Sequence, residues 1–167
     1  AFYKTPPPTD RIRPVNSGCA FAKWGLSLVL RSTQVLCALK KLSRLQLGVA
    51  YKRGIEVVIH ACRAMLELGY ALLSLDLTNA FNEVQRLYMF EQLNLRCPAL
   101  NPYAEIFYRP QSLCFYWVNG AATIIRSAEG SRMGCLLGCI LFVFSVHTAF
   151  TDFVDNSPTA NRHGPCK

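Results

Sequence analysis

The residue best suited to chemistry is Asp76, the only acidic residue between Glu67 and Glu83. It follows a strongly apolar run, residues 70–77, whose composition predicts a fully buried β-strand. A buried carboxylate without a partner is costly, so such a residue is usually hydrogen-bonded, ion-paired or bound to a metal ion. Divalent-cation binding is therefore the chemistry open to Asp76, and satisfaction by neighbouring backbone N–H groups is the purely structural alternative.

A second chemical signal is the uneven distribution of positive charge. The formal net charge is +8, and residues 1–53 hold ten lysines and arginines against the single acidic residue Asp10. The remainder of the chain is close to neutral. A basic lobe beside a near-neutral one is typical of proteins that contact polyanions, because each phosphate that is neutralised releases counterions. A basic surface that is only solvated is the alternative.

Cysteine usage indicates a reduced, intracellular protein. The chain has eight cysteines, most of them in apolar stretches, and no Cys-x-x-Cys pair. Free cysteine is among the most buried residue types, so we predict a reduced interior and no disulfide framework. Zinc is not favoured, because the tightest pair, Cys135 and Cys139, has only His147 nearby.

The elements that must position these residues follow from periodicity and from glycine and proline. A short strand is predicted at residues 10–15, and apolar and basic side chains separate with helical spacing over residues 26–45. A second helix is expected between residues 54 and 69, bounded by glycine at both ends. The strand at 70–77 leads into a helix from about residue 79 to residue 97, where a proline follows.

The clearest local signal is a β-hairpin. Residues 113–118 and 121–125 are rich in β-branched and aromatic residues and flank Asn119-Gly120, the dipeptide that favours a type I′ turn. A polar loop at 127–134 then opens into a long apolar helix. This order of elements predicts an α+β fold with a β-hairpin and a long buried C-terminal helix.

The apolar run from 133 to 151 also meets the length criterion for a membrane span, because its nineteen residues carry no formal charge. It contains Ser145, His147, Thr148 and two glycines, which are unfavourable in lipid. We therefore expect a helix buried in protein and no membrane partner. A small single-span membrane protein is kept as an alternative.

Four segments in order resemble the reverse transcriptases of non-long-terminal-repeat retrotransposons. Residues 75–84, Leu-Asp-Leu-Thr-Asn-Ala-Phe-Asn-Glu-Val, are similar to the first carboxylate motif of that family, with Asp and then an aromatic residue five positions later. Residues 11–15 look like the fingers segment with its Arg-Pro pair. Residues 46–63 are similar to the next fingers block, and residues 129–142 to the glycine-containing template and nucleotide motif. The resemblance spans about 130 residues.

The resemblance implies an RNA-directed DNA polymerase, with the fingers and part of the palm of a right-hand polymerase fold. It places an incomplete reverse transcriptase domain at residues 1–154, with the fingers at about 1–69 and the partial palm at about 70–154. Residues 155–167 leave the pattern and are expected to be disordered. The implied partners are an RNA template, a DNA primer, deoxynucleoside triphosphates and the rest of the polymerase chain, in an intracellular, nuclear setting.

By the resemblance, Asp76 would bind two Mg²⁺ ions, and the backbone carbonyl of Leu77 would supply a further ligand. Two such ions would clamp the attacking and leaving oxygens of nucleotidyl transfer, and hard cations prefer carboxylate oxygen. Phe81 would lie beneath the sugar of the incoming nucleotide, where an aromatic wall disfavours a 2′-hydroxyl. Ordinary helix packing is the alternative for Phe81.

The resemblance also assigns the polar contacts. Arg13 and Arg11 would bind the triphosphate, since arginine suits bidentate phosphate recognition, and ordinary exposed strand residues are the alternative. The implied nucleotide and template residues are Gly134, Met133, Lys52, Arg53 and Arg132. Gly134 could instead be a helix-start glycine without chemical consequence.

The chain departs from the family pattern at three points. Met133 stands where glutamine is usual, and a thioether cannot donate the hydrogen bond of an amide. Leu136 stands where proline is common. The second carboxylate motif, aromatic-x-Asp-Asp, is absent, since Asp152 and Asp155 lack its spacing. We therefore expect a polymerase fragment that is inactive alone, and a non-catalytic nucleic-acid-binding relic is the main alternative.

Overall fold

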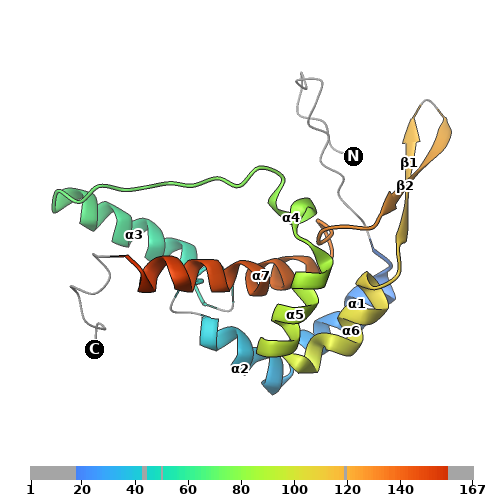
Figure 1. Cartoon of the computed structure of the whole chain (residues 1–167), viewed down its shortest axis with the longest axis horizontal. Helices are drawn as coiled ribbons and strands as arrows, with labels where there is room; N and C mark the ends of the chain where they lie inside the picture. Colours follow the sequence, from blue (N-terminus) through green and yellow to red (C-terminus); the bar gives the residue numbers. More distant parts are fainter. Residues whose placement is uncertain (1–17, 43–44, 50, 119, 158–167) are drawn as a thin grey trace.

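The computed structural model describes residues 18–42, 45–49, 51–118 and 120–157, and it has a mixed α+β fold, as the sequence predicts. A long helix, α7 (Leu136–Asp155), packs against α5 (Arg86–Arg96), and both helices contact shorter neighbours (Figure 1). The remaining elements are α1 (Ala20–Leu30), α2 (Thr33–Leu42), α3 (Gly54–Glu67), α4 (Ala80–Glu83), the 3₁₀ turn η1 (Pro98–Leu100), α6 (Asn101–Tyr108), β1 (Ser112–Val118) and β2 (Ala121–Ser127).

The core is centred on the packing of α7 against α5 and α1, and buried residues of α2, η1 and α6 complete it. Apolar residues of α7 recur on the side that faces these helices, so that Leu137, Leu141 and Phe144 are fully buried. Met89 and Leu93 of α5 are equally buried. The predicted long C-terminal helix is therefore confirmed, but it is buried along one face only, and it ends at Asp155 rather than at residue 151.

α7 is also the one helix of the described residues that is long and apolar enough to cross a membrane. The same property is found in core helices of soluble proteins, and eight residues of α7 are buried inside the fold, including Ser145 and His147. The residues that follow Ser157 lie outside the described part of the chain, so the prediction of a disordered tail at 155–167 is not tested there. Its first residue, Asp155, is helical, and this part of the prediction is wrong.

Two predicted helices are each divided in two. The helix expected at 26–45 is broken at Arg31 and Ser32, whose N–H groups bond to the carbonyls of Leu28 and Val29 as one tight turn. The helix expected at 79–97 is divided between α4 and α5, because Val84 is extended and its carbonyl accepts a hydrogen bond from the Gly130 N–H at 3.0 Å. Apolar periodicity continues across both breaks, so it did not reveal them.

The hairpin prediction is confirmed. β1 and β2 pair antiparallel with Ser112 opposite Ser127, and Gly120 has the positive φ of 79° that a tight turn requires. Asn119 lies outside the described residues. The hairpin projects from the helical body, to which it is joined at its base (Figure 1).

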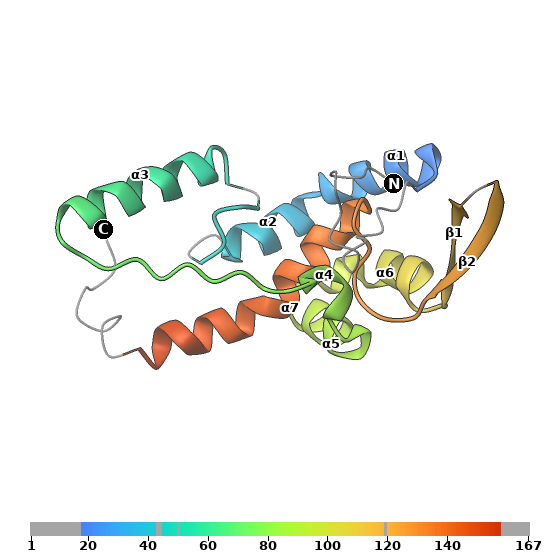
Figure 2. The ribbon, with the colours of Figure 1, turned by 90° about the horizontal axis from the view of Figure 1, so that it is seen from above.

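The predicted buried strand at residues 70–77 is wrong. The segment is extended, but it forms no β-ladder with any described residue and its side chains are exposed, Leu73 by 72% and Leu75 by 73%. Figure 2 shows it running between α3 and α4 without an adjoining strand. An extended apolar segment becomes a buried strand only when neighbouring strands accept its backbone hydrogen bonds, and the described chain provides none.

Candidate nucleic-acid interface

The structure brings together two of the segments singled out in the sequence, α4 and the loop at 127–134. The Ser131 N–H donates to the carbonyl of Phe81 at 2.7 Å, and the Gly130 N–H donates to the carbonyl of Val84 at 3.0 Å. The Ser131 hydroxyl bonds to the same Phe81 carbonyl across a separation of 50 residues. The glycine loop is therefore fixed directly against the helix that follows Asp76.

Local sequence explains how α4 begins. Asn79 precedes it with a φ of 52°, a left-handed conformation that asparagine tolerates better than most residues. Its side-chain amide donates to Glu83 Oε1 at 2.9 Å, and its Oδ1 accepts from the amide of Asn82 at 2.7 Å. These bonds define a sharp turn between the extended segment and the loop contact.

Gly130 permits the close approach of the loop to α4. Its φ is 69°, and a Cβ atom at this position would lie 2.4 Å from the backbone oxygen of Asn82. No other residue type fits there without movement of the backbone.

Arg86 ties the loop and the hairpin base to the helical body. It is 8% exposed. Its Nε donates to the Gly130 carbonyl at 3.1 Å, its Nη1 to the Tyr108 carbonyl at 3.1 Å, and its Nη2 to Ser127 Oγ at 2.9 Å and the Glu129 carbonyl at 3.2 Å. Burial and the neighbouring Arg132 lower the pKa of Arg86, but the guanidinium stays charged because an arginine pKa lies far above neutral pH.

Tyr108 lies between Arg86 and Arg132 in the sense that both guanidinium groups contact its ring. The Arg132 guanidinium lies 4.7 Å from the centre of the Tyr108 ring and donates to the Phe107 carbonyl. The Arg132 N–H donates to the Tyr108 hydroxyl at 3.2 Å. Burial, reinforced by Cys135, raises the pKa of Tyr108, so the phenol remains neutral. Arg132 Nε is buried and has no hydrogen-bond partner among the described residues.

A pocket of about 200 Å³ opens beside Arg132. Two of the residues that line it are cationic, Lys23 of α1 and Arg132, and none is acidic. Gly134, with a φ of 85°, lines the same pocket. Small neighbours, Gly18 and Ala22, keep it open. Lys23 and Arg132 give the pocket positive charge, and its other lining residues are uncharged.

The structure thus brings Phe81, Arg132 and Gly134 to one region of the molecule. Phe81 stacks on Phe142 of α7, with ring centroids 4.8 Å apart and planes at 27°. This contact accounts for Phe81 as a packing residue, which was the alternative considered for it. Met133 is half-buried in the loop between Arg132 and Gly134.

Asp76 and Leu77 lie outside this region. Both are exposed on the extended segment, and neither lines the pocket. The described residues contain no group of three or more His, Cys, Asp or Glu side chains that could hold a metal ion. The expectation that Asp76 is a buried carboxylate is therefore wrong, because the strand that would have buried it does not form.

The other predicted contacts are dispersed. Lys52 and Arg53 are exposed beside the start of α3, where Arg53 lies 4.0 Å from Glu56 in a surface ion pair. Arg11 and Arg13 lie outside the described residues.

Sequence reasoning missed Arg86, Tyr108 and Lys23. Arg86 follows α4 in a stretch that reads as one amphipathic helix, and no local pattern marks it as buried. Lys23 is one of the ten cationic residues at 1–53, and nothing in its local sequence sets it apart from the others. The signal that could have identified Arg86 is its position three residues before the buried Met89, because residues three apart share one face of a helix.

No protein-family model, curated protein or solved structure matches this chain.

Proposed function

We propose that this chain is part of an RNA-directed DNA polymerase, a nuclear protein of the reverse transcriptase type. In this proposal it contributes fingers and part of the palm, and it binds an RNA template, a DNA primer and deoxynucleoside triphosphates. The observation that carries the proposal is the junction of α4 with the glycine loop. A nucleotide site of this type needs these two segments side by side, and they are 50 residues apart in the chain.

The charge distribution supports nucleic acid as the ligand. No acidic residue occurs between Asp10 and Glu56, while Lys23, Arg31, Lys41 and other cations lie on that stretch. The pocket beside Gly134 adds Arg132 from the other end of the chain. Phosphate contacts of this kind supply most of the affinity of nucleic-acid-binding proteins and make it sensitive to salt.

The described residues do not form a two-magnesium site by themselves. Asp76 is one exposed carboxylate, and no second acidic group joins it in a cluster among the described residues. A single carboxylate cannot hold two divalent ions in line with the reacting phosphate. We propose that a second carboxylate from outside the described residues completes the site, and that the chain alone does not extend primers.

Primer extension on an RNA template tests this proposal. We expect no extension by the present chain, and Mg²⁺-dependent extension by a polypeptide continued through an aromatic-x-Asp-Asp hairpin. In the continued form, Asp76→Asn should abolish extension and leave template binding nearly unchanged, because the side chain is exposed and supports no contact of the fold. Glu67→Gln, which removes another acidic side chain from the exposed surface, is the matched control and should leave extension unchanged. Extension by the short chain, or extension that survives Asp76→Asn, would contradict the proposal.

A second candidate function is nucleic-acid binding without catalysis. Two observations on the described residues favour it. Two cationic residues line a formed pocket, whereas Asp76 belongs to no cluster of potential metal ligands. Under this reading the chain binds RNA equally well with and without Mg²⁺, and the continued polypeptide remains inactive. Extension by the continued polypeptide would exclude it.

A further inference from the structure

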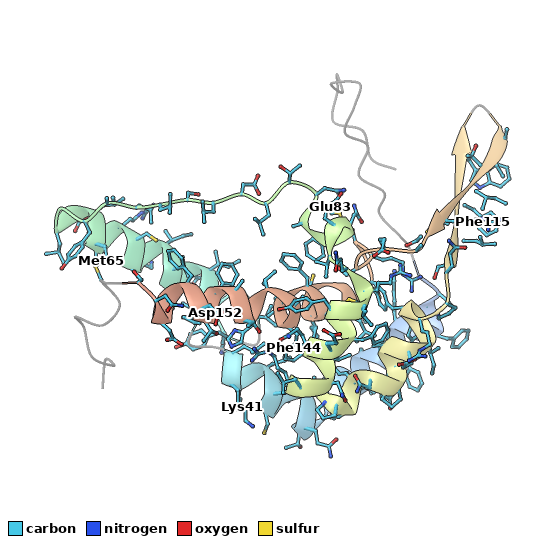
Figure 3. All side chains as sticks on the ribbon, in the orientation of Figure 1. Lys41, Met65, Glu83, Phe115, Phe144 and Asp152 are labelled. Carbon is cyan, nitrogen blue, oxygen red and sulfur yellow. The ribbon has the colours of Figure 1, made fainter. Side chains whose placement is uncertain are left out.

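The face of the hairpin that carries Leu113, Phe115 and Trp117 has no partner within the described chain. The antiparallel register places Ala122, Ile124 and Arg126 opposite these residues on the same face. Phe115 is 64% exposed and Trp117 is 72% exposed. Figure 3 shows Phe115 pointing away from the helical body. Large aromatic side chains gathered on one exposed face mark a binding surface.

The hairpin base is rigidly held, although the face is open. Ser127, the last residue of β2, accepts a hydrogen bond from the buried Arg86 guanidinium at 2.9 Å. Two-stranded hairpins are marginal in water when they stand alone. This anchor therefore fixes the direction in which the aromatic face points, and the chain continues from β2 directly into the loop that carries Arg132 and Gly134.

The charges around this face indicate what binds it. No acidic residue occurs between Glu105 and Glu129, and Arg126 lies on the aromatic face. A protein partner that buried this guanidinium would need a carboxylate to pair with it. A nucleic-acid strand supplies both flat rings for Phe115 and Trp117 and a phosphate for Arg126. Alternate residues of a strand lie about 7 Å apart, which allows each ring to stack with a separate unpaired base.

We propose that this face, the aromatic hairpin face, is a stacking platform for single-stranded nucleic acid. Bases stack on Phe115 and Trp117 while Arg126 contacts the backbone, and the strand leads toward the pocket lined by Arg132. The inference rests on the proposed nucleic-acid binding but adds a site that the resemblance does not assign.

The test measures the binding of a 12-nucleotide single-stranded RNA. Binding is monitored by quenching of tryptophan fluorescence and by the fluorescence anisotropy of a labelled strand. Trp117→Leu and Phe115→Leu keep the face apolar but remove the rings. Each should weaken binding about tenfold, because each substitution removes a ring on which a base would stack. Trp117→Tyr should retain most of the affinity. Arg126→Gln should reduce the slope of log affinity against log salt by about one.

The matched control is Phe153→Leu, at a side chain that is 65% exposed near the C-terminal end of α7. It should leave the affinity unchanged. A DNA strand of the same sequence should bind within a few-fold of the RNA, because ring stacking does not detect the 2′-hydroxyl.

Three results would overturn the inference. RNA affinity that is unchanged in both leucine variants would show that the rings do not stack with bases. Equal losses in Phe153→Leu would show a general effect of removing surface aromatics. Concentration-dependent dimers that dissociate in Trp117→Leu would assign the face to a second copy of the chain. If the unmodified chain binds no nucleic acid, the proposed function fails as well, whereas binding that ignores the hairpin overturns only this inference.

Discussion

Replacement of Gly130 by alanine should separate the glycine loop from α4. The added Cβ would lie 2.4 Å from the Asn82 oxygen, 2.5 Å from its Cα and 2.6 Å from its carbonyl carbon, all under the 3.0 Å that real Cβ contacts keep. The left-handed backbone itself costs alanine about 1–2 kcal/mol. Displacement of the loop would also break the bonds from Gly130 and Ser131 to the α4 segment, at about 1–3 kcal/mol each when buried groups stay unpaired. We therefore expect a loss of about 3–8 kcal/mol in the free energy of unfolding.

Gly120→Ala is the matched control. Gly120 has a similar φ of 79° in the hairpin turn, but a Cβ there would meet no atom within 4 Å. Only the backbone term applies, so the expected loss is about 1–2 kcal/mol. Urea denaturation of both variants, with hydrogen exchange at the Ser131 amide, measures the difference. Equal losses in the two variants, or unchanged protection of Ser131 in Gly130→Ala, would refute the close contact of loop and helix.

Four further substitutions test other parts of the structure. Arg86→Met should lower the free energy of unfolding by about 3–5 kcal/mol in urea denaturation, because it leaves the buried carbonyls of Gly130 and Tyr108 and the partly buried carbonyl of Glu129 without this donor; a loss under 1 kcal/mol would contradict the bonding described. In the same assay, Leu75→Ala should lower the free energy of unfolding by less than about 0.5 kcal/mol, because Leu75 is 73% exposed. Leu141→Ala should lower it by about 2–5 kcal/mol, because Leu141 is fully buried. Equal losses would show that residues 70–77 are packed as a buried strand. Burial and the charge of Arg96 lower the pKa of His147 in the folded chain. The unfolded chain therefore binds the proton more readily. The free energy of unfolding should fall as the pH drops from about 6.5 toward the folded pKa. His147→Gln should remove that part of the pH dependence in urea titrations at several pH values, and an unchanged dependence would assign it to other groups.

The sequence predicts the local elements of this fold well where one signal dominates. The hairpin has alternating β-formers around Asn-Gly, and α7 is an uninterrupted apolar run, so both are found where expected. Prediction fails where a distant segment decides the outcome. The break between α4 and α5 depends on a hydrogen bond from Gly130, and the strand at 70–77 depends on neighbours that the described residues do not provide.

The residues of the candidate site also fall into two groups, those that a local motif identifies and those that only tertiary contacts bring in. Gly134 and Arg132 could be identified from their motif, and the structure brings them to one pocket. Lys23 and Arg86 enter the region only through tertiary contacts, because they belong to helices that are distant from the loop in sequence. The position of Asp76 could not be predicted, since its burial would have required a complete sheet around residues 70–77.

We propose that this chain binds nucleic acid through phosphate contacts, and a salt titration tests this most directly. The measurement is the affinity of the unmodified chain for an RNA template annealed to a DNA primer with a single-stranded overhang, at salt concentrations from about 50 to 200 mM. We expect log affinity to fall linearly with log salt by several units of slope, and the slope to be smaller by about one in Arg132→Gln. Absence of binding, or an affinity that does not change across the titration, would contradict the account.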